Sequence, residues 1–451
     1  MTAGADADAI AEAVRAGLPR ARDDLARLVA LRSVADGSQP EQCATAAAEV
    51  AGLIGGAGVD GVRRVETTDG SLAVLGHTTG PPGAPTVLLY SHYDVQPAGD
   101  PAAWGSSPWE LTERDGRWYA RGAADCKGNL VMQLAALRAL PRPWPVGIRM
   151  VCEGSEEMST GGLAALVRAD PESFAADAIL VCDTGNVELG RPTITTSLRG
   201  TGSVLVTVDT LAGPVHSGMY GGAAPDALAA LVALLATLRD DAGDTTVRGL
   251  DASDRWEGAD YPADRFRADA GVLEGVSLLG EGSVADTVWA RPAATVLALD
   301  APRVAEATAA VQHTARALVN LRVPPGHSAA TAQRLLVEHL RAAAPWGARV
   351  RVEPRTLGEP FAARTDGPAF AALADALGSA FGRPAVTAGQ GGAIPLCNVL
   401  AAAHPVAEIL LLGVEEPGSR IHAPDESVHP EELERTALGL ARFLASYAQV
   451  N

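Results

Sequence analysis

Two adjacent carboxylates, Glu156 and Glu157, follow an apolar run and constrain most strongly how this chain can fold. The run Val146–Val151 has the composition of a buried strand, and Gly154 and Ser155 place the two acids in a turn. Adjacent carboxylates repel each other, and taking an unpaired carboxylate out of water is costly. The sequence therefore predicts a cation or a shared proton at this turn.

Four further residues of the kind that bind metals lie at or shortly after the ends of other apolar runs. They are His92, Asp125, Asp183 and His422. Ligands of open α/β sheets bind beyond the carboxyl ends of the strands, so these side chains are expected to meet Glu157 there. Imidazoles and carboxylates without a thiolate suit zinc, manganese or cobalt. Five ligands are too many for one tetrahedral zinc, and they fit two ions that share a bridging carboxylate.

Two more acids have predicted roles beside these ligands. Asp94, two residues after His92, can accept the second ring N–H of that histidine and fix its tautomer. Glu156 is next to a ligand but faces differently, and it is the natural general base. Singly, each residue has a structural explanation, since a lone Asp after a strand is usually a helix cap. Only the occurrence of all these residues near the ends of predicted elements favours a catalytic role.

Composition excludes several classes of function. With 451 residues the chain is long enough for two domains, and its 47% hydrophobic content is typical of a globular protein. The net charge of −18 argues against nucleic acid or an anionic membrane as a partner. No apolar run approaches the roughly 18 residues of a membrane span. Five scattered cysteines and an acidic N-terminal segment predict a cytoplasmic protein without a disulfide framework.

One residue stands out against this composition. Of the 36 Lys and Arg residues, only Lys127 is a lysine, and it follows Asp125 by two positions. This isolation indicates a place where a compact ammonium fits and a wide guanidinium does not.

The order of predicted elements indicates one domain inserted into another. Strands and helices alternate from Thr86 to Asp183, which predicts an α/β domain with a mostly parallel sheet covered on both faces. After Thr196 the order becomes β-α-β-β-α-β, typical of a ferredoxin-like α+β sandwich. We expect a discontinuous catalytic domain of residues 1–197 and 359–451 and an inserted domain of residues 198–358.

Nine motifs, in order along nearly the whole chain, resemble the di-metal aminoacylase/carboxypeptidase-like peptidases, in particular carnosine dipeptidases and cytosolic non-specific dipeptidases. The motifs are SHYDVQP (91–97), RGAADCKG (121–128), EGSEE (153–157), CDTG (182–185), TTSLRG (195–200), VHSGMYGG (215–222), LRVP (321–324), GQGGAIP (389–395) and RIHAPDE (420–426).

This resemblance implies a di-zinc exopeptidase fold with two divalent ions per chain, Zn²⁺ or alternatively Mn²⁺ or Co²⁺. It assigns His92 and Asp183 to one ion, Glu157 and His422 to the other, and Asp125 to the bridge. Glu156 is then the base. The peptide bond after Asp125 is typically cis in this family.

The resemblance also implies that the inserted domain is a lid that forms a homodimer. In that arrangement His216 reaches the active site of the partner subunit. Arg322 binds the terminal carboxylate of a small peptide substrate, a task that suits its planar fork of donors. Gly392 and Ala393 are the remaining expected substrate contacts.

Four residues depart from the family pattern without touching the predicted metal ligands. Cys126 stands where a second Asp is usual, Gln390 where an acid is common, Ala393 where Ser is usual and Asp425 where Asn is usual. The departures at Gln390 and Ala393 concern substrate selectivity.

Three functions compete for this sequence. The first is hydrolysis of dipeptides or short peptides with a free C-terminal carboxylate, which VHSGMYGG and HYDVQP favour. The second is an N-acyl amino acid deacylase or a specialised amidase of secondary metabolism, because the same metal centre serves any amide. The third is a catalytically silent binding or scaffolding protein, which would require a missing ligand or base, and none is missing.

Overall fold

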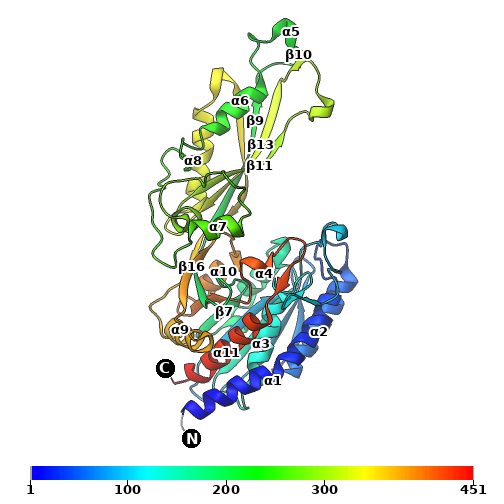
Figure 1. The fold of residues 1–451 in the computed structure, drawn as a ribbon, viewed down its shortest axis with the longest axis vertical. Helices are drawn as coiled ribbons and strands as arrows, with labels where there is room; N and C mark the ends of the chain where they lie inside the picture. Colours follow the sequence, from blue (N-terminus) through cyan, green and yellow to red (C-terminus); the bar gives the residue numbers. More distant parts are fainter. Residues whose placement is uncertain (1–2, 450–451) are drawn as a thin grey trace. The chain divides into compact units, whose positions relative to one another are not determined.

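The computed structural model describes the backbone of residues 3–449 and the side chains of residues 8–449. The chain forms two compact units (Figure 1). The first contains the chain up to Thr196, Ala363–Ala388 and the chain from Leu396 onward. The second contains Ser197–Ala362 and Gly389–Pro395.

The structure places Gly389–Pro395 in the second unit, whereas the sequence predicted that this segment lies in the first domain. It belongs to the second unit because its backbone is bound there. The N–H of Arg199 donates to the carbonyl of Gln390. Gly389 approaches Trp289 so closely that an added Cβ would lie 2.6 Å from the tryptophan side chain.

A mixed sheet runs through the first unit in the order β1-β2-β6-β3-β7-β17-β8, and β16 (Val386–Gln390) also pairs with β8. The strands are Arg63–Glu66 (β1), Leu72–Thr78 (β2), Thr86–His92 (β3), Gly147–Glu153 (β6), Ala178–Cys182 (β7), Thr193–Leu198 (β8) and Glu408–Leu412 (β17). The four central strands, β6, β3, β7 and β17, are parallel. Antiparallel strands flank them on both sides. The predicted α/β class with a mainly parallel sheet is confirmed.

Both faces of the central strands are buried, which explains their continuous apolar runs. In β3, Val87 and Leu89 join one core cluster, whereas Leu88 and Tyr90 lie outside this cluster, and all four are buried.

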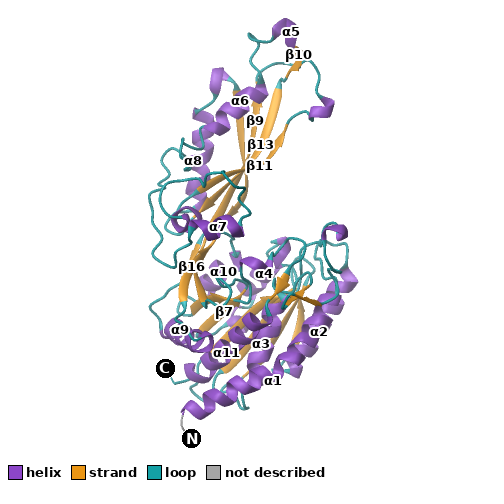
Figure 2. Ribbon diagram, in the orientation of Figure 1, coloured by secondary structure: helices purple, strands orange, loops and turns teal. Residues whose placement is uncertain are grey.

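Helices cover the two faces of this sheet. The cluster that contains Val87 and Leu89 is completed by α1 (Ala3–Ala30), α2 (Pro40–Gly56), α3 (Lys127–Ala139), α9 (Pro368–Phe381) and α11 (Pro430–Tyr447). Helices α1, α3 and α11 lie side by side in Figure 2. Helices α4 (Gly162–Ala169) and α10 (Pro395–Ala403) bury residues that are not part of this cluster. The sequence analysis had missed α10.

A small antiparallel sheet in the first unit joins two distant parts of the chain. Its strands are β4 (Thr112–Arg114), β5 (Arg117–Tyr119) and β18 (Ser427–Val428), in the order β18-β5-β4. Ser427 pairs with Tyr119, and Val428 pairs with Trp118. This pairing holds the segment that carries His422 against the segment that leads to Asp125.

The second unit contains the predicted β-α-β-β-α-β order. Its antiparallel sheet has the order β11-β13-β9-β14, with strands Gly200–Asp209 (β9), Ala293–Asp300 (β11), Thr314–Val323 (β13) and Arg349–Gly358 (β14). Helices α6 (Ala227–Ala236) and α8 (Ala329–Ala342) share a core with this sheet. The smaller elements are β10 (Val215–His216), α5 (Ser217–Tyr220), α7 (Ala263–Asp269), β12 (Ala310–Val311) and β15 (Phe361–Ala362). Helix α7 lies in the Asp- and Gly-rich tract between α6 and β11.

None of the helices in the described part of the chain combines the length and apolar character needed to cross a membrane.

The single lysine joins two helices of the first unit. Lys127 is fully buried at the start of α3. Its Nζ donates to the carbonyls of Leu28 and Leu31, at the end of α1, at 3.0 and 2.9 Å. Burial lowers the pKa of Lys127 to about 7. Gly122 lies so near that an added Cβ would be 3.1 Å from the lysine Cδ. The ammonium thus fills a confined space.

Replacing Lys127 by arginine is expected to destabilise the protein. The wider guanidinium overpacks the space beside Gly122, and overpacking typically costs about 1–3 kcal/mol. The thermal unfolding midpoint measures the effect. The control is Arg64→Lys on β1, which exchanges the same two residue types at an exposed position. A Lys127→Arg protein that unfolds at the wild-type temperature would show that the space accepts a guanidinium.

Candidate metal centre

The five predicted ligands lie together in the first unit, at the carboxyl ends of its central strands. His92 ends β3, Asp183 follows β7, and Glu157 lies in the turn that follows β6. Two groups of possible ligand atoms share Asp125, one with Glu157 and His422 and one with Asp183 and Glu415, and in each group all atoms lie within 4.8 Å of one another.

Asp125 occupies the middle of the cluster. Its Oδ1 lies 3.0 Å from Nε2 of His92, and its Oδ2 lies 2.9 Å from Nε2 of His422. Nε2 of His92 is also 3.1 Å from Asp183, and that of His422 is 3.2 Å from Glu157. Each imidazole therefore faces a different oxygen of Asp125 and one further carboxylate. This is the arrangement that a bridging carboxylate requires.

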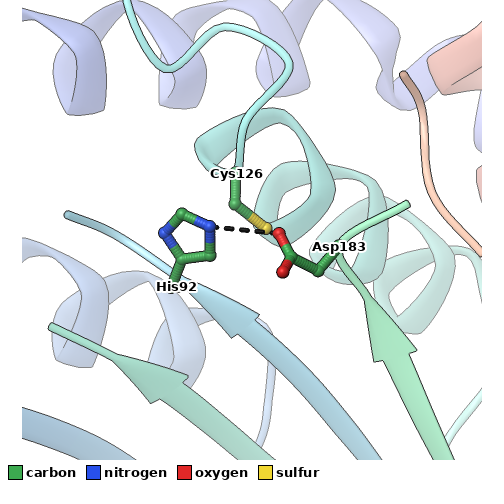
Figure 3. A group of neighbouring side chains, drawn as sticks. All are labelled: His92, Cys126 and Asp183. Atoms are coloured by element: carbon green, nitrogen blue, oxygen red, sulfur yellow. Dashed lines mark hydrogen bonds and ion pairs between the residues drawn. The ribbon is translucent and has the colours of Figure 1, made fainter. Parts of the chain in front are cut away.

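The ring of His92 is held from its other side by Asp94. Nδ1 of His92 lies 3.1 Å from the backbone oxygen of Asp94 and 3.4 Å from its carboxylate. Nε2, on the opposite side of the ring, points toward Asp183 (Figure 3). The backbone oxygen thus makes the nearer contact, whereas the prediction had named the side chain.

The carboxylate of Asp94 instead fixes the turn that carries the two glutamates. It accepts the N–H of Glu156 at 3.1 Å and that of Glu157 at 3.0 Å. Gln96 donates to Oε2 of Glu157 at 2.9 Å. The 3-10 turn Glu156–Met158 is therefore anchored through its backbone.

A second aspartate, which the sequence analysis overlooked, holds both flanks of this turn. Asp69 accepts hydrogen bonds from Ser155, at 2.8 Å, and from Thr160. Burial raises the pKa of Asp69, but the hydroxyl donors outweigh burial, and the net pKa lies well below its usual range. Asp69 is therefore a charged clamp. Its position in the Thr67–Gly70 turn, far from any motif, gave no reason to select it.

Buried charges also fix the backbone beside Asp125. Glu426 accepts the N–H groups of Ala124 and Asp125, both at 3.1 Å, and its other oxygen accepts from Arg121 at 2.6 Å. The peptide bond between Asp125 and Cys126 is cis, as the resemblance implied.

His422 lies on a loop with unusual backbone conformations. Arg420, His422 and Asp425 all have positive φ values, between 53° and 62°. Such values are uncommon outside glycine and mark constrained sites. Asp425 accepts from the N–H of Gly105 at 2.9 Å and from Arg114 at 2.7 Å, which anchors the loop. The side chain of His422 remains 52% exposed, so the cluster is accessible.

The protonation of the cluster shows a shortage of positive charge. Burial raises the pKa of Asp183 to about 6, and burial together with the charge of Asp183 raises the pKa of Glu156. Hydrogen bonds with Asp125 and Glu157 raise the pKa of His422 to about 10. Protons thus occupy positions where cations would bind. A donor set of imidazoles and carboxylates suits divalent ions, so the residues fit a metal centre.

Two further possible ligands were not predicted. Glu415 is buried near Asp125 and Asp183, and its Oε1 accepts from Asn129 at 3.0 Å. It follows β17 as Asp183 follows β7, so the rule of strand ends could have found it. Cys126 joins His92 and Asp183 in a third group. A thiol therefore lies within reach of two of the five predicted ligands.

The predicted substrate residues lie in the second unit. Ala393 and Gly392 belong to the segment Gly389–Pro395, Arg322 lies on β13, and His216 ends β10. The pKa of Arg322 is lowered by burial, and that of Arg199 is lowered to about 10 by burial and by the charge of Arg322. Nε and Nη1 of Arg199 are buried and have no hydrogen-bond partner among the described residues.

Comparisons with known proteins agree with this geometry. Residues 88–446 match the model of a protein family described as "Peptidase family M20/M25/M40". A cysteinylglycine-S-conjugate dipeptidase of Corynebacterium striatum is 48% identical over 394 residues, which cover 86% of this chain and 87% of that protein. Human Beta-Ala-His dipeptidase is 36% identical over 182 residues, or 39% of this chain and 36% of that protein. The crystal structure of human carnosine dipeptidase 1 has the same fold, with a TM-score of 0.82 at 22% identity, covering 98% of this chain and 99% of that one.

Binding of Zn²⁺ is expected to release protons and to weaken as the pH falls. The raised pKa of His422 means that its ring is protonated at pH 7 and must lose a proton before it can bind a metal. Below a pH of about 6, Asp183 must also lose one. Calorimetry in buffers of different ionisation enthalpy measures the released protons. Zinc binding without proton release at pH 7, and with an affinity independent of pH, would contradict this account.

Proposed function

This chain belongs to peptidase family M20/M25/M40, and we propose that it is a metal-dependent dipeptidase. Its substrates are dipeptides or short peptides with a free C-terminal carboxylate. The observation that carries the proposal is the position of Asp125, whose two oxygens each face the imidazole of a different histidine. The names of the similar dipeptidases support the substrate class.

Two divalent ions per chain complete the proposed site. His92 and Asp183 hold one, Glu157 and His422 hold the other, and Asp125 bridges them. Zn²⁺ suits these donors, and Mn²⁺ or Co²⁺ can replace it. The ions, when bound, lower the pKa of the attacking water and polarise the scissile carbonyl.

Glu156 is the proposed general base. The hydrogen bond from its backbone N–H to Asp94 fixes its place in the turn, next to a ligand but without a ligand's role. Its carboxylate takes a proton from the attacking water and transfers it to the leaving amine. Burial and the charge of Asp183 raise the pKa of Glu156, so its carboxylate holds a proton more readily than a free glutamate.

Arg322 is the proposed partner of the substrate carboxylate. No ion pair neutralises its guanidinium among the residues that the structure describes, and burial removes part of its solvation. Nearby Arg199 also carries unpartnered nitrogens. Two guanidinium groups that lack counter-ions favour an anion between them. Gly392 and Ala393 are proposed as the other substrate contacts, on the resemblance alone.

The second unit has features that support a homodimer. Strand β11 lies at the edge of its sheet, and Val296, Leu297 and Leu299 are exposed on it. An exposed apolar edge strand favours pairing with another strand, and a two-fold axis allows two copies to pair. His216 is exposed, and its Nδ1 accepts the N–H of Gly218 at 3.1 Å, which leaves the proton on Nε2. In the proposed dimer this N–H donates to the oxyanion in the neighbouring subunit.

All five cysteines are free, which supports the cytoplasm as the proposed location.

Glu156→Gln is expected to retain two zinc ions per chain and to lose turnover by about 10²-fold or more, the usual contribution of a general base. Turnover is measured on dipeptides and on N-acyl amino acids, and metal content by elemental analysis. The matched control, Glu110→Gln, changes an exposed glutamate and should keep full activity. Near-normal turnover of Glu156→Gln with two bound ions would disprove the base. Cleavage of N-acyl amino acids alone would favour the deacylase.

Mixing two inactive proteins, His216→Ala and Glu156→Gln, is expected to restore activity when subunits exchange. In the heterodimer one site has lost both groups, while the other has an intact Glu156 and receives an intact His216 from its neighbour. Activity should rise with the fraction of heterodimer, which native mass spectrometry measures. Inactive heterodimers, or full activity of His216→Ala alone, would contradict the contribution of His216 across the dimer.

A further inference from the structure

Cys126 lies inside the candidate metal centre. It follows Asp125 directly and stands at the N-cap position of α3, fully buried. Its Sγ, a ring nitrogen of His92 and a carboxylate oxygen of Asp183 all lie within 4.8 Å of one another. Figure 3 shows the sulfur directed toward the side of Asp183 that faces His92. The thiol thus shares the space of the two residues proposed to hold one ion.

The surroundings of the sulfur suit a ligand. The thiol donates to the carbonyl of Cys182 at 3.0 Å, and it makes no capping hydrogen bond to α3. The side-chain amide of Asn129 donates to the sulfur at 3.5 Å. The sulfur thus accepts a hydrogen bond from an amide and lies at the N-terminus of a 13-residue helix. When a metal binds, the S–H bond breaks, the sulfur–metal bond forms and the proton leaves to solvent.

The other cysteines have different surroundings. Cys152, Cys182 and Cys397 are buried, and Cys43 is partly exposed. Among the described residues, none of these four belongs to a group of possible metal ligands, whereas Cys126 does. The chain therefore places a thiol at one position of the centre, where the family pattern has a carboxylate.

We propose that Cys126 is a ligand of the ion held by His92 and Asp183, so that this half of the centre binds through nitrogen, oxygen and sulfur. The inference rests on the proposed di-metal site. Thiolates favour zinc and cadmium over manganese, which prefers oxygen. This half of the centre should therefore select Zn²⁺ from a mixture, while the half formed by Glu157 and His422 has no sulfur and accepts Mn²⁺ more readily.

X-ray absorption at the zinc edge tests the proposal on the unmodified protein. The fully loaded protein should contain a zinc–sulfur distance of about 2.3 Å, besides zinc–nitrogen and zinc–oxygen distances of about 2.0–2.2 Å. The sulfur signal should amount to one sulfur for every two zinc ions. Cys126→Ser should lose this signal, and the control Cys43→Ser, which removes a thiol outside the centre, should keep it.

Competition between metals gives a second measurement. From a mixture of Zn²⁺ and Mn²⁺, the wild-type protein should take up zinc in preference, and Cys126→Ser should lower this preference by about tenfold or more, because even residues that only support ligands contribute that much affinity. Two bound zinc ions without a sulfur signal would overturn the role of Cys126 and leave the di-metal site standing. A protein that binds no zinc would overturn both.

Discussion

Repulsion among buried carboxylates is the constraint on which the first unit depends. Parallel strands bring Asp183 and the turn of Glu157 to one edge of the sheet, and the start of α3 adds Asp125. Among the residues that the structure describes, His92 and His422 are the ion-pair partners of these carboxylates. The pKa of His422 is raised and that of Asp183 is raised as well, so the cluster holds protons in place of cations. A strongly acidic cluster of this kind is stable only with positive charge at its centre.

A set of buried hydrogen bonds keeps this costly cluster rigid. Asp94 binds the backbone of Glu156 and Glu157, and Glu426 binds the backbone of Asp125. Asp69 holds the flanks of the same turn through hydroxyl groups. Each of these three residues is itself a carboxylate that accepts several hydrogen bonds. The ligands are thus fixed by acids whose own charges are satisfied, which prevents them from turning away from one another. Preorganisation of this kind is what metal sites need for affinity and selectivity.

In the second unit, positive charges rather than negative ones are partly buried. Arg199 and Arg322 lie near each other with lowered pKa values and without a carboxylate partner among the described residues. The segment Gly389–Pro395 belongs to this unit, and its Gly391 lies beside Arg199. A Cβ added to Gly391 would lie 3.1 Å from the guanidinium. A glycine at this point leaves room beside the cation. The acidic centre of one unit suits cations, and the basic residues of the other suit a carboxylate.

The sequence by itself determined most of the elements and most of the residues that meet in the candidate metal centre, because these depend on local patterns. Apolar runs ending in His92 and Asp183 gave the strands and their carboxyl ends, and the β-α-β-β-α-β order gave the inserted unit. Tertiary structure decided which side chains meet. Pairing of β18 with β5 brings the loop of His422 to Asp125 across nearly three hundred positions of the chain. The same packing places Cys126, Glu415 and Asp69 at the site. No local pattern distinguishes Cys126 from a core thiol or Asp69 from a turn residue, whereas Glu415 follows a strand as Asp183 does. Their roles depend on contacts between distant segments, and only the folded chain contains those contacts.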